Sequence, residues 1–306
     1  MAAQAPTISA EKAPRLSLGL PVYNGERFLA ACLDSILGQT WGDFEVIACD
    51  NASTDGTAAM LAEYAARDGR IRIHRADVNR GAAANFNWTF ELARGELFKW
   101  CAADDVLQPT FLAECVAALD SQPGAVLAWS GALDIDDDGH VLREIYDNRH
   151  PMRFDAATPA ARFHELVCWD HSCIAVFGVV RTPAMRRTSL IGPYVGSDRT
   201  FLAELGLQGR LVRVGDDLLL HREHAGRSVN EIADLRRRTV WFDSKAHGPA
   251  FPHWRLLREY LHAVNASRLP HAERRRCLMG VARWVKWRAW RQLLGDLGHN
   301  LKVARR

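Results

Sequence analysis

Short apolar runs alternate with longer amphipathic stretches over the first part of the chain. Apolar runs bounded by turn formers predict buried strands, and apolar residues at three- and four-residue steps predict helices. The predicted strands are 16–20, 44–49, 71–74 and 97–101, and the helices that follow the first three end near residues 37, 67 and 93. This alternation predicts an α/β fold with a mainly parallel sheet and helices on both faces.

The pattern is less regular farther along the chain. It predicts a helix over 109–119, a strand over 125–133 that turns at 136–139 into residues 141–142, a strand over 173–180, a helix over 200–207 and a strand over 211–220. From about residue 233 the pattern is helical again. We expect a flexible tail over 1–14, one main domain over 15–230 and a helical C-terminal extension over 231–306.

Composition and cysteine usage indicate an ordinary globular protein. A chain of 306 residues can bury the core of one large α/β domain with an appendage. Its seven cysteines form no C-x-x-C pair, so we interpret them as buried side chains in a reducing compartment. Residues 1–14 lack the features of a signal peptide and no stretch approaches a membrane span, which predicts a cytoplasmic protein.

Charge is unevenly distributed along the chain. From Arg274 to Arg306 there are ten Lys and Arg residues and one acid, Asp296, so this segment carries +9 and the rest −6. Apolar residues in the same segment recur mostly at three- and four-residue steps: Cys277, Trp284, Trp287, Trp290, Leu294, Leu297 and Leu301. A basic helix rich in tryptophan predicts peripheral contact with an anionic membrane. Packing of this stripe on the main domain or on a partner subunit is the alternative.

Polar pairs follow three of the predicted strands, at Tyr23-Asn24, Asp50-Asn51 and Asp104-Asp105. Parallel sheets bind ligands beyond the carboxyl ends of their strands, where these pairs lie. Two adjacent acids after a buried strand are costly unless a cation neutralises them or a proton is taken up. A divalent metal ion that carries a diphosphate meets this requirement.

Four motifs in order carry a resemblance to a known family: residues 21–25 (PVYNG), 50–57 (DNASTDGT), 79–81 (NRG) and 103–105 (ADD). Together, over roughly residues 15–225, they resemble the family 2 glycosyltransferases. The resemblance implies a GT-A fold and inverting transfer of a sugar from a nucleotide-diphosphate donor to an acceptor hydroxyl. It also implies a nucleotide-binding half over 15–122 and an acceptor half over 123–230.

The first two motifs match the family's nucleotide-contacting segments. Pro21, Tyr23 and Asn24 match its first turn, and a plain strand-to-helix turn is the alternative. Asp50 and Asn51 match the pair that contacts the base, and a helix cap is the alternative. The amide of Asn51 can both accept and donate a hydrogen bond, so uracil and thymine both fit and guanine is not excluded.

The next two motifs concern the diphosphate. Arg80 matches a basic position near the nucleotide, and an ordinary surface arginine is the alternative. Asp105 matches the metal ligand and Asp104 the contact on the ribose side, although Ala102 stands where many members carry a further acid. Carboxylate and phosphate oxygens suit Mg²⁺ or Mn²⁺. A helix N-cap pair is the alternative for the two aspartates.

Two later segments complete the resemblance. Within residues 196–199, Asp198 matches the family's catalytic base, which takes the acceptor proton, and a helix cap is the alternative. Within residues 221–224, His224 fits a second metal or diphosphate contact, and a surface histidine is the alternative. Residues 134–139 resemble the start of a calcium loop, but Ile145 stands where a glutamate is needed, so a hairpin turn is predicted.

The leading hypothesis is therefore a metal-dependent glycosyltransferase of surface polysaccharide or glycolipid synthesis. It would take a UDP-, dTDP- or GDP-sugar and a saccharide or lipid-linked acceptor, with no nucleic acid partner. One alternative is a nucleotidyltransferase, but the Gly-rich, basic phosphate loop expected after its first strand is missing at residues 21–24. Another is a nucleotide-sugar-binding protein without catalysis, against which the presence of both Asp105 and Asp198 argues. The sequence does not identify the sugar or the acceptor.

Overall fold

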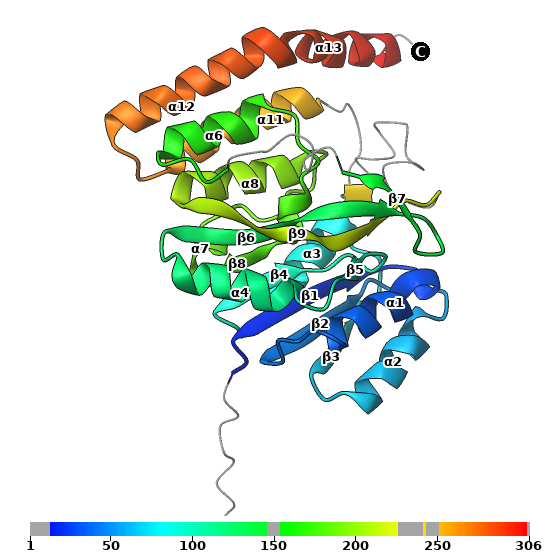
Figure 1. The fold of residues 1–306 in the computed structure, drawn as a ribbon. Helices are drawn as coiled ribbons and strands as arrows, with labels where there is room; N and C mark the ends of the chain where they lie inside the picture. Colours follow the sequence, from blue (N-terminus) through cyan, green and yellow to red (C-terminus); the bar gives the residue numbers. More distant parts are fainter. Residues whose placement is uncertain (1–12, 146–153, 226–240, 243–250, 305–306) are drawn as a thin grey trace, which may run out of the picture.

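The computed structural model describes residues 13–145, 154–225, 241–242 and 251–304 (Figure 1). The strands are β1 (Leu16–Val22), β2 (Phe44–Asp50), β3 (Ile71–Arg75), β4 (Leu97–Trp100), β5 (Val106–Leu107), β6 (Ala125–Ile135), β7 (Val141–Glu144), β8 (Val179–Arg181) and β9 (Arg210–Arg222). The helices of the first half are α1 (Glu26–Leu37), α2 (Thr57–Arg67), α3 (Ala82–Glu91) and α4 (Phe111–Ser121). Those of the second half are α6 (Pro159–Cys168), α7 (Thr182–Met185), α8 (Ser197–Gln208), α11 (Pro252–Ala266), α12 (His271–Trp284) and α13 (Trp290–Ala304).

One mixed sheet joins all the described strands in the order β3-β2-β1-β4-β8-β6-β9-β5, with β7 paired to β6. The first four strands are parallel, as the alternation of strands and helices predicted. Beyond β4 the sheet becomes mixed, because β8 pairs antiparallel to both β4 and β6, while β6 and β9 are parallel. The sheet therefore runs without a break from residues of the predicted nucleotide-binding half to those of the predicted acceptor half.

Close packing of α3 on β1 explains why the first strand contains a glycine. A Cβ at Gly19 would lie 2.3 Å from Oγ1 of Thr89, on α3, and 2.6 Å from the ring of Phe98, on β4. Both strands are buried along their whole length. Continuous apolar runs are the signature of strands covered on both faces.

The predicted strand over 173–180 is wrong for most of its length. Residues Ile174–Phe177 form a 3₁₀ turn, and only Val179–Arg181 pairs in the sheet, as β8. The turn begins after Cys173, whose φ is 64°, outside the range of a strand. Gly178 then passes close to β6, where an added Cβ would lie 2.5 Å from the carbonyl oxygen of Ala128. Burial of a short irregular segment produced the same apolar run as a strand.

The C-terminal helices form the outermost layer on the side of the sheet away from β3 (Figure 1). Beneath α12 and α13 lie α6 and α11, and a π turn, Val285–Ala289, joins α12 to α13. Tyr260, Cys277 and Trp284 of this layer belong to the same hydrophobic core as the sheet. The helical tail is thus confirmed where it is described, while residues 231–240 and 243–250 lie outside the described residues. No described helix is long and apolar enough to cross a membrane.

Candidate active site

The loops after β1 and β2 are held together by hydrogen bonds from side chains. The backbone N–H of Asn24 donates to Oγ of Ser53 (2.9 Å), and Asn24 Oδ1 accepts the backbone N–H of Thr54 (2.8 Å). Asn24 has φ of 51°, a left-handed conformation that asparagine tolerates better than most residues. Tyr23 is half exposed beside it, whereas Pro21 is buried in β1 opposite Cys49.

Asp50 lies at the end of β2 and is 1% exposed. Its Oδ1 accepts the N–H of Ser53 at 2.8 Å. Its Oδ2 lies 3.3 Å from Nη1 of Arg75, yet it accepts no hydrogen bond from the described residues. A buried carboxylate oxygen without a donor is unusual and needs an explanation, which a bound ligand can supply.

Asn51 is engaged entirely within the protein. Its Nδ2 donates to Oδ1 of Asn79 (2.9 Å), and its Oδ1 accepts the N–H of Arg80 (2.9 Å). The side chain is 3% exposed and so fixes the loop at Asn79–Gly81. The Arg80 guanidinium, for its part, lies over the ring of Trp88, 4.5 Å from its centroid. The contact of Asn51 with a base therefore stays a prediction. In the structure, Asn51 holds the loop at Asn79–Gly81.

Asn85, on α3, is a residue that the sequence analysis missed. Its Nδ2 donates to the carbonyl oxygens of Cys49 (2.9 Å) and Val22 (3.4 Å), and so bridges the ends of β2 and β1. Its Oδ1 is buried and accepts no hydrogen bond from the described residues. The signal in the sequence was an amide on the helix face that otherwise packs on the sheet.

Two carboxylate–imidazole pairs connect the end of β4 with the end of β9. Nδ1 of His221 lies 3.0 and 3.2 Å from the two carboxylate oxygens of Asp105, and the N–H of Arg222 donates to the same carboxylate at 3.0 Å. Nε2 of His224 lies 3.1 Å from Oδ2 of Asp104. Asp105 is 4% exposed, while the side chain of Asp104 is 33% exposed. The structure thus brings Asp104, Asp105 and His224 together and adds His221, which the sequence analysis did not select.

Hydrogen bonds and nearby charges offset the free-energy cost of burying these acids. Burial alone would raise the pKa of Asp104, but the hydrogen bond with His224 and the nearby His221 lower it below its ordinary value. Arg222 also braces the site, because its Nε donates to the Asp104 carbonyl (3.0 Å) and its Nη1 to the Asp136 carbonyl (2.6 Å). The ring of Phe28, on α1, lies under both Arg222 and His224.

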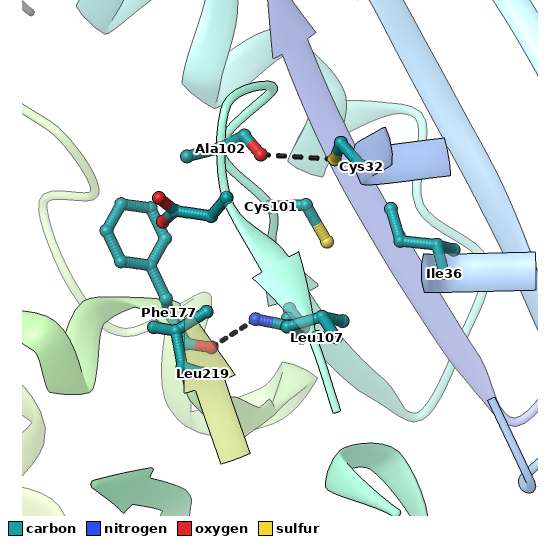
Figure 2. Close-up of a pocket in the computed structure, with 9 residues that line it drawn as sticks. Cys32, Ile36, Cys101, Ala102, Leu107, Phe177 and Leu219 are labelled. Carbon is teal, nitrogen blue, oxygen red and sulfur yellow. Dashed lines mark hydrogen bonds between the residues drawn. The ribbon is translucent and has the colours of Figure 1, made fainter. Parts of the chain in front are cut away.

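A buried lysine lies behind Asp105. Lys99, 1% exposed on β4, donates through Nζ to the carbonyl oxygens of Trp100 (3.1 Å) and Phe177. It shares with Asp105 the lining of a small apolar cavity of about 10 Å³, room for about one water molecule (Figure 2). The cavity is too small for a substrate group, so it belongs to the support of the site.

The donor set at the strand ends fits a divalent cation. Carboxylate oxygens are the ligands of Mg²⁺ and Mn²⁺, and imidazole nitrogens also suit transition metals. The four side chains form two pairs, however, and not a single cluster of protein ligands. A metal ion bound there would take its remaining ligands from substrate phosphates and water.

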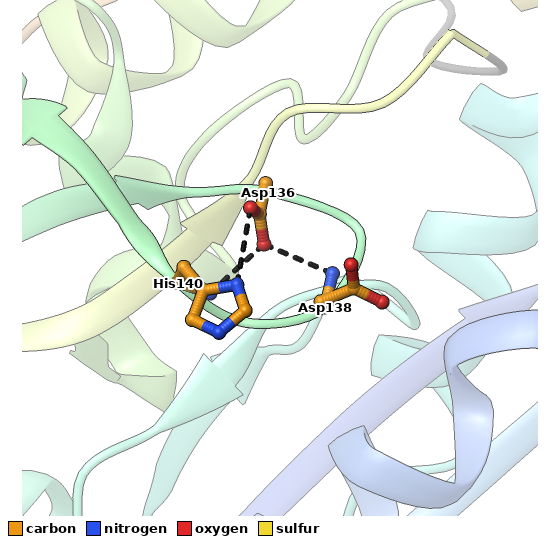
Figure 3. Close-up of side chains that lie close together, drawn as sticks. All are labelled: Asp136, Asp138 and His140. Carbon is orange, nitrogen blue, oxygen red and sulfur yellow. Dashed lines mark hydrogen bonds and ion pairs between the residues drawn. The ribbon is translucent and has the colours of Figure 1, made fainter.

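A second group of potential ligands lies at the β6–β7 turn, where atoms of Asp136, Asp138 and His140 fall within 4.8 Å of one another (Figure 3). Asp136 Oδ1 accepts the N–H groups of Asp138 (2.9 Å) and His140 (2.8 Å). These bonds are those of a turn in which an aspartate caps its own loop. The predicted hairpin turn is confirmed.

Asp198 lies in the first turn of α8, after Gly196, which has φ of 86°. Its carboxylate accepts the N–H of Arg199 at 2.8 Å. Among the described residues, no hydrogen bond or ion pair joins it to the two carboxylate–imidazole pairs. The structure therefore places Asp198 at a helix N-terminus, and its contact with an acceptor stays a prediction.

The C-terminal extension holds this turn in place. An added Cβ at Gly196 would lie 3.3 Å from Leu256 of α11. Arg199 donates to the carbonyl oxygens of His171 (3.2 Å) and Trp169 (3.0 Å), which fixes the other side of the turn. The extension is therefore part of the structural support of the segment that carries Asp198.

Comparisons with known proteins give the family and the fold. The family model described as "Glycosyl transferase family 2" matches residues 17–180. An O-antigen biosynthesis protein of Myxococcus xanthus is 35% identical over 141 residues, 45% of this chain and 11% of the relative. A PGL/p-HBAD biosynthesis glycosyltransferase of Mycobacterium bovis is 35% identical over 138 residues, 40% of this chain and 54% of the relative. The match thus spans about half or less of these relatives' own length.

Two solved structures share the fold. TarS of S. aureus in complex with UDP-GlcNAc has a TM-score of 0.67 at 16% identity, covering 94% of this chain and 81% of that one. A mannosyltransferase of Pyrobaculum calidifontis in complex with GDP-Man and Mn²⁺ has a TM-score of 0.56 at 18% identity, covering 99% and 79%. The expected GT-A fold with its mixed sheet and helical C-terminal segment is confirmed. With a family model that matches more than half of its length, the chain belongs to glycosyl transferase family 2.

Proposed function

We propose that the protein transfers a sugar from a nucleotide-diphosphate donor to an acceptor hydroxyl, with inversion at the anomeric carbon. The observation that carries this proposal is the pairing of Asp104 and Asp105, after β4, with two histidines: His224, after β9, and His221, at its end. These groups lie beyond the carboxyl ends of parallel strands, where open α/β sheets bind their ligands. Membership in family 2 supports the same reaction.

The nucleotide is proposed to bind across the ends of β1 and β2. Asp50 Oδ2 and Asn85 Oδ1 are buried acceptors without a donor among the described residues, so N–H groups of a base complement them. Uracil, thymine and guanine each present a ring N–H, which supports UDP, dTDP or GDP as the nucleotide. The UDP-GlcNAc complex of TarS and the GDP-Man complex of the mannosyltransferase support this donor class.

The remaining donor contacts keep the roles that the family motifs imply. Pro21, Tyr23 and Asn24 form the first nucleotide turn, of which the half-exposed Tyr23 ring is the accessible part. Asn51 acts on the nucleotide through the loop that it holds, and Arg80 lies on that loop. Asp104, the more exposed of the two aspartates, belongs on the ribose side.

A divalent cation, Mn²⁺ or Mg²⁺, is proposed to bind at Asp105, with His224 as a second contact. The short distance between Asp105 and His221 supports adding His221 to this set. When bound, the ion would offset the negative charge on the departing diphosphate. The Mn²⁺ in the mannosyltransferase complex supports the same chemistry.

Asp198 is proposed as the general base. The acceptor oxygen forms a bond to the anomeric carbon while the bond from that carbon to the diphosphate oxygen breaks, and the nucleoside diphosphate leaves with the electron pair. Asp198 takes the proton that the acceptor hydroxyl loses. Attack opposite the leaving group produces the inverted configuration.

The acceptor is proposed to be a saccharide or a lipid-linked saccharide of surface polysaccharide or glycolipid synthesis. The biosynthetic relatives named above support this class. Synthesis of that kind supports the expected location of the protein in the cytoplasm, at the inner face of the membrane.

Donor binding is tested by thermal shift with UDP-, dTDP- and GDP-sugars, with and without Mn²⁺. One nucleotide class should raise the melting temperature, and Mn²⁺ should increase that shift. Asp50→Asn should abolish it, because the buried acceptor oxygen is exchanged for an amide. No shift with any donor would contradict the proposed function.

Catalysis is tested by the release of nucleoside diphosphate in the presence of Mn²⁺. Wild-type protein should turn over the donor that the thermal shift selects, whereas Asp198→Asn should bind it and lose turnover with an acceptor. A protein that binds the donor but never turns it over would be a nucleotide-sugar-binding protein. Undiminished transfer by Asp198→Asn would remove this residue as the base.

A further inference from the structure

The helices α12 and α13 carry apolar side chains both toward the body and toward the outside. The inner face packs on the body through buried side chains: Cys277, Val281, Trp284, Ala289 and Leu293. The outer face carries large exposed apolar side chains, with exposed fractions of 51% for Met279, 72% for Trp287, 46% for Trp290, 59% for Leu294 and 41% for Leu297. A group of large exposed apolar side chains on a helix that is already packed marks a surface for a partner. The sequence stripe thus divides between packing on the protein and an outward surface.

The inner face is fixed to the body by specific polar contacts. Glu273 accepts the N–H of Ala160 at the start of α6 (3.1 Å), and Asp296 accepts the N–H of His253 at the start of α11 (2.9 Å). Arg288 forms an ion pair with Asp170 at 2.6 Å. These contacts fix the two helices on the body. Their outer face is therefore exposed although the helices are already packed.

A π turn at Val285–Ala289 lies where the two faces carry tryptophan. Trp284, just before it, is buried at 8% exposure, and Trp287 and Trp290 emerge on the outer side. A π turn inserts one residue into the helix and is frequent at functional sites. Its position allows one short segment to supply an inner anchor and two outer indoles.

The outer face is cationic. Exposed basic side chains flank its apolar residues: Arg275, Arg276, Arg283, Lys286 and Arg291. The acids of the two helices, Glu273 and Asp296, are 15% and 5% exposed and are used in the inner contacts, and Glu273 also pairs with Arg276 (2.6 Å). Lys286 lies over the Trp287 ring (4.7 Å) and Arg291 over the Trp290 ring (5.1 Å), so cations and indoles occupy the same surface.

We propose that this outer face of α12–α13 binds the surface of an anionic membrane. Indole rings favour the region of the lipid headgroups, and exposed Lys and Arg are attracted to anionic lipid. No described helix can cross a membrane, so the contact is that of a helix lying on the surface.

Charge decides against a second copy of the chain as the occupant. A twofold contact between two such faces would bring their cations together, and the two acids of these helices are largely buried, with Glu273 paired to one of the cations, Arg276. An anionic lipid surface complements both the charge and the apolar residues. The inference does not depend on the proposed reaction, because it uses none of the residues of the strand ends.

Co-sedimentation of the full chain with vesicles tests the proposal. Vesicles of phosphatidylcholine with phosphatidylglycerol are compared with vesicles of phosphatidylcholine alone, at low and high salt. Wild-type protein should partition at least ten-fold more strongly onto the anionic vesicles, and high salt should reduce the difference. Trp287→Ala with Trp290→Ala should lower partitioning about ten-fold per indole.

Charge variants separate the two contributions. Each exposed cation near an anionic surface contributes about five-fold, so Lys286→Gln with Arg291→Gln should lower binding to anionic vesicles about 25-fold. The matched control is Val141→Ala with Leu142→Ala, which removes exposed apolar side chains from β7 and should leave binding unchanged. Circular dichroism and thermal unfolding establish that each variant is folded.

Two results would overturn the proposal. One is equal partitioning of wild type and the α12–α13 variants onto anionic vesicles. The other is a dimer of wild-type protein in light scattering that becomes a monomer in Trp287→Ala with Trp290→Ala, since a second copy would then occupy the face. Donor thermal shifts, measured in parallel, report on the proposed function separately.

Discussion

The side chains of the strand-end site and those of the outer face of α12–α13 differ in how far they are bound by the rest of the protein. At the strand ends, most polar groups are bound to other groups of the protein, as with Asn24, Asn51 and the two carboxylate–imidazole pairs. On the outer face, indoles and aliphatic side chains are exposed and have no covering layer among the described residues. The first region is organised before any ligand arrives, and the second is complete only with a partner.

Two atoms of the strand-end site are exceptions to this comparison. Within the well-bound strand-end site, Asp50 Oδ2 and Asn85 Oδ1 accept no hydrogen bond from the described residues. A site whose surroundings are fixed in this way follows the rule for preorganised binding. Changes at the fixed groups should therefore affect activity or stability, and changes on the outer face should affect neither.

The largest effect is expected for Asp105→Asn. Loss of the charge that faces the proposed metal should lower kcat about 10³-fold, near 4 kcal/mol. Initial rates at several Mn²⁺ concentrations measure the change, and higher Mn²⁺ should not restore the rate. Asp138→Asn, on the β6–β7 turn, is the matched control and should keep wild-type activity. Loss of activity in the control, with Asp105→Asn active, would move the metal to the turn.

Two tryptophans three residues apart test the two faces of the C-terminal helices. Trp284→Ala should lower the free energy of unfolding by about 3 kcal/mol, because it empties a buried site. Trp287→Ala should change it by less than about 0.5 kcal/mol, because the side chain is exposed. Denaturant unfolding of both variants gives the values. Similar losses for the two would mean that the outer indole is packed in solution.

Asn51→Ala should lower the free energy of unfolding by about 2 kcal/mol, since it leaves the N–H of Arg80 without its acceptor. It should also raise the KM for the donor through the loosened Asn79–Gly81 loop. Asn51→Asp keeps the acceptor and loses the donor, so its loss of stability should be smaller. Urea unfolding and donor titrations measure both. An unchanged KM in Asn51→Ala would separate this loop from nucleotide binding.

The smallest effect is expected at the opposite ends of the strands, where Glu45 lies at the start of β2. Burial alone would raise the pKa of Glu45, but hydrogen bonds from Arg94, Arg72 and Ser17 lower it below its ordinary value of 4.5. A lowered pKa stabilises the fold at neutral pH, and this contribution is lost as the pH falls below the ordinary value through the folded one. Unfolding measured between neutral and acidic pH should show this loss in wild type. In Glu45→Gln that part of the pH dependence should disappear.

Local patterns in the sequence were enough to predict the first half of the fold. Continuous apolar runs marked β1, β2 and β4, and helical spacing marked the elements between them, so the ends of the strands and their polar pairs could be located. The cost of burying Asp105 was also expected, and in the structure His221 and the N–H of Arg222 contact its carboxylate. These features depend on neighbours in the sequence or on general rules of sheets.

Contacts between distant parts of the chain were not visible in the same way. His221 reaches Asp105 across more than a hundred residues, and no spacing rule links the two. Asn85 looked like an ordinary helix residue until its partners at Cys49 and Val22 were known. The apolar run at 173–180 fitted a strand because burial, and not pairing, sets that pattern. The apolar stripe in the tail was compatible with packing on the main domain and with an outward surface, and its residues are found in both positions.

The pairing of Asp105 with His221 also bears on how the protein is made. The aspartates emerge from the ribosome long before β9, so a nascent chain holds both acids without their imidazole partners or Arg222. Domains generally fold as units, and long-range pairings form late. The centre of the molecule is therefore completed only after residue 224 has been synthesised. A chain that stops before this point lacks β9 and its pairings, so we expect proteases to cleave it faster than the complete chain. The strand-end site therefore forms only in a chain that has completed its sheet.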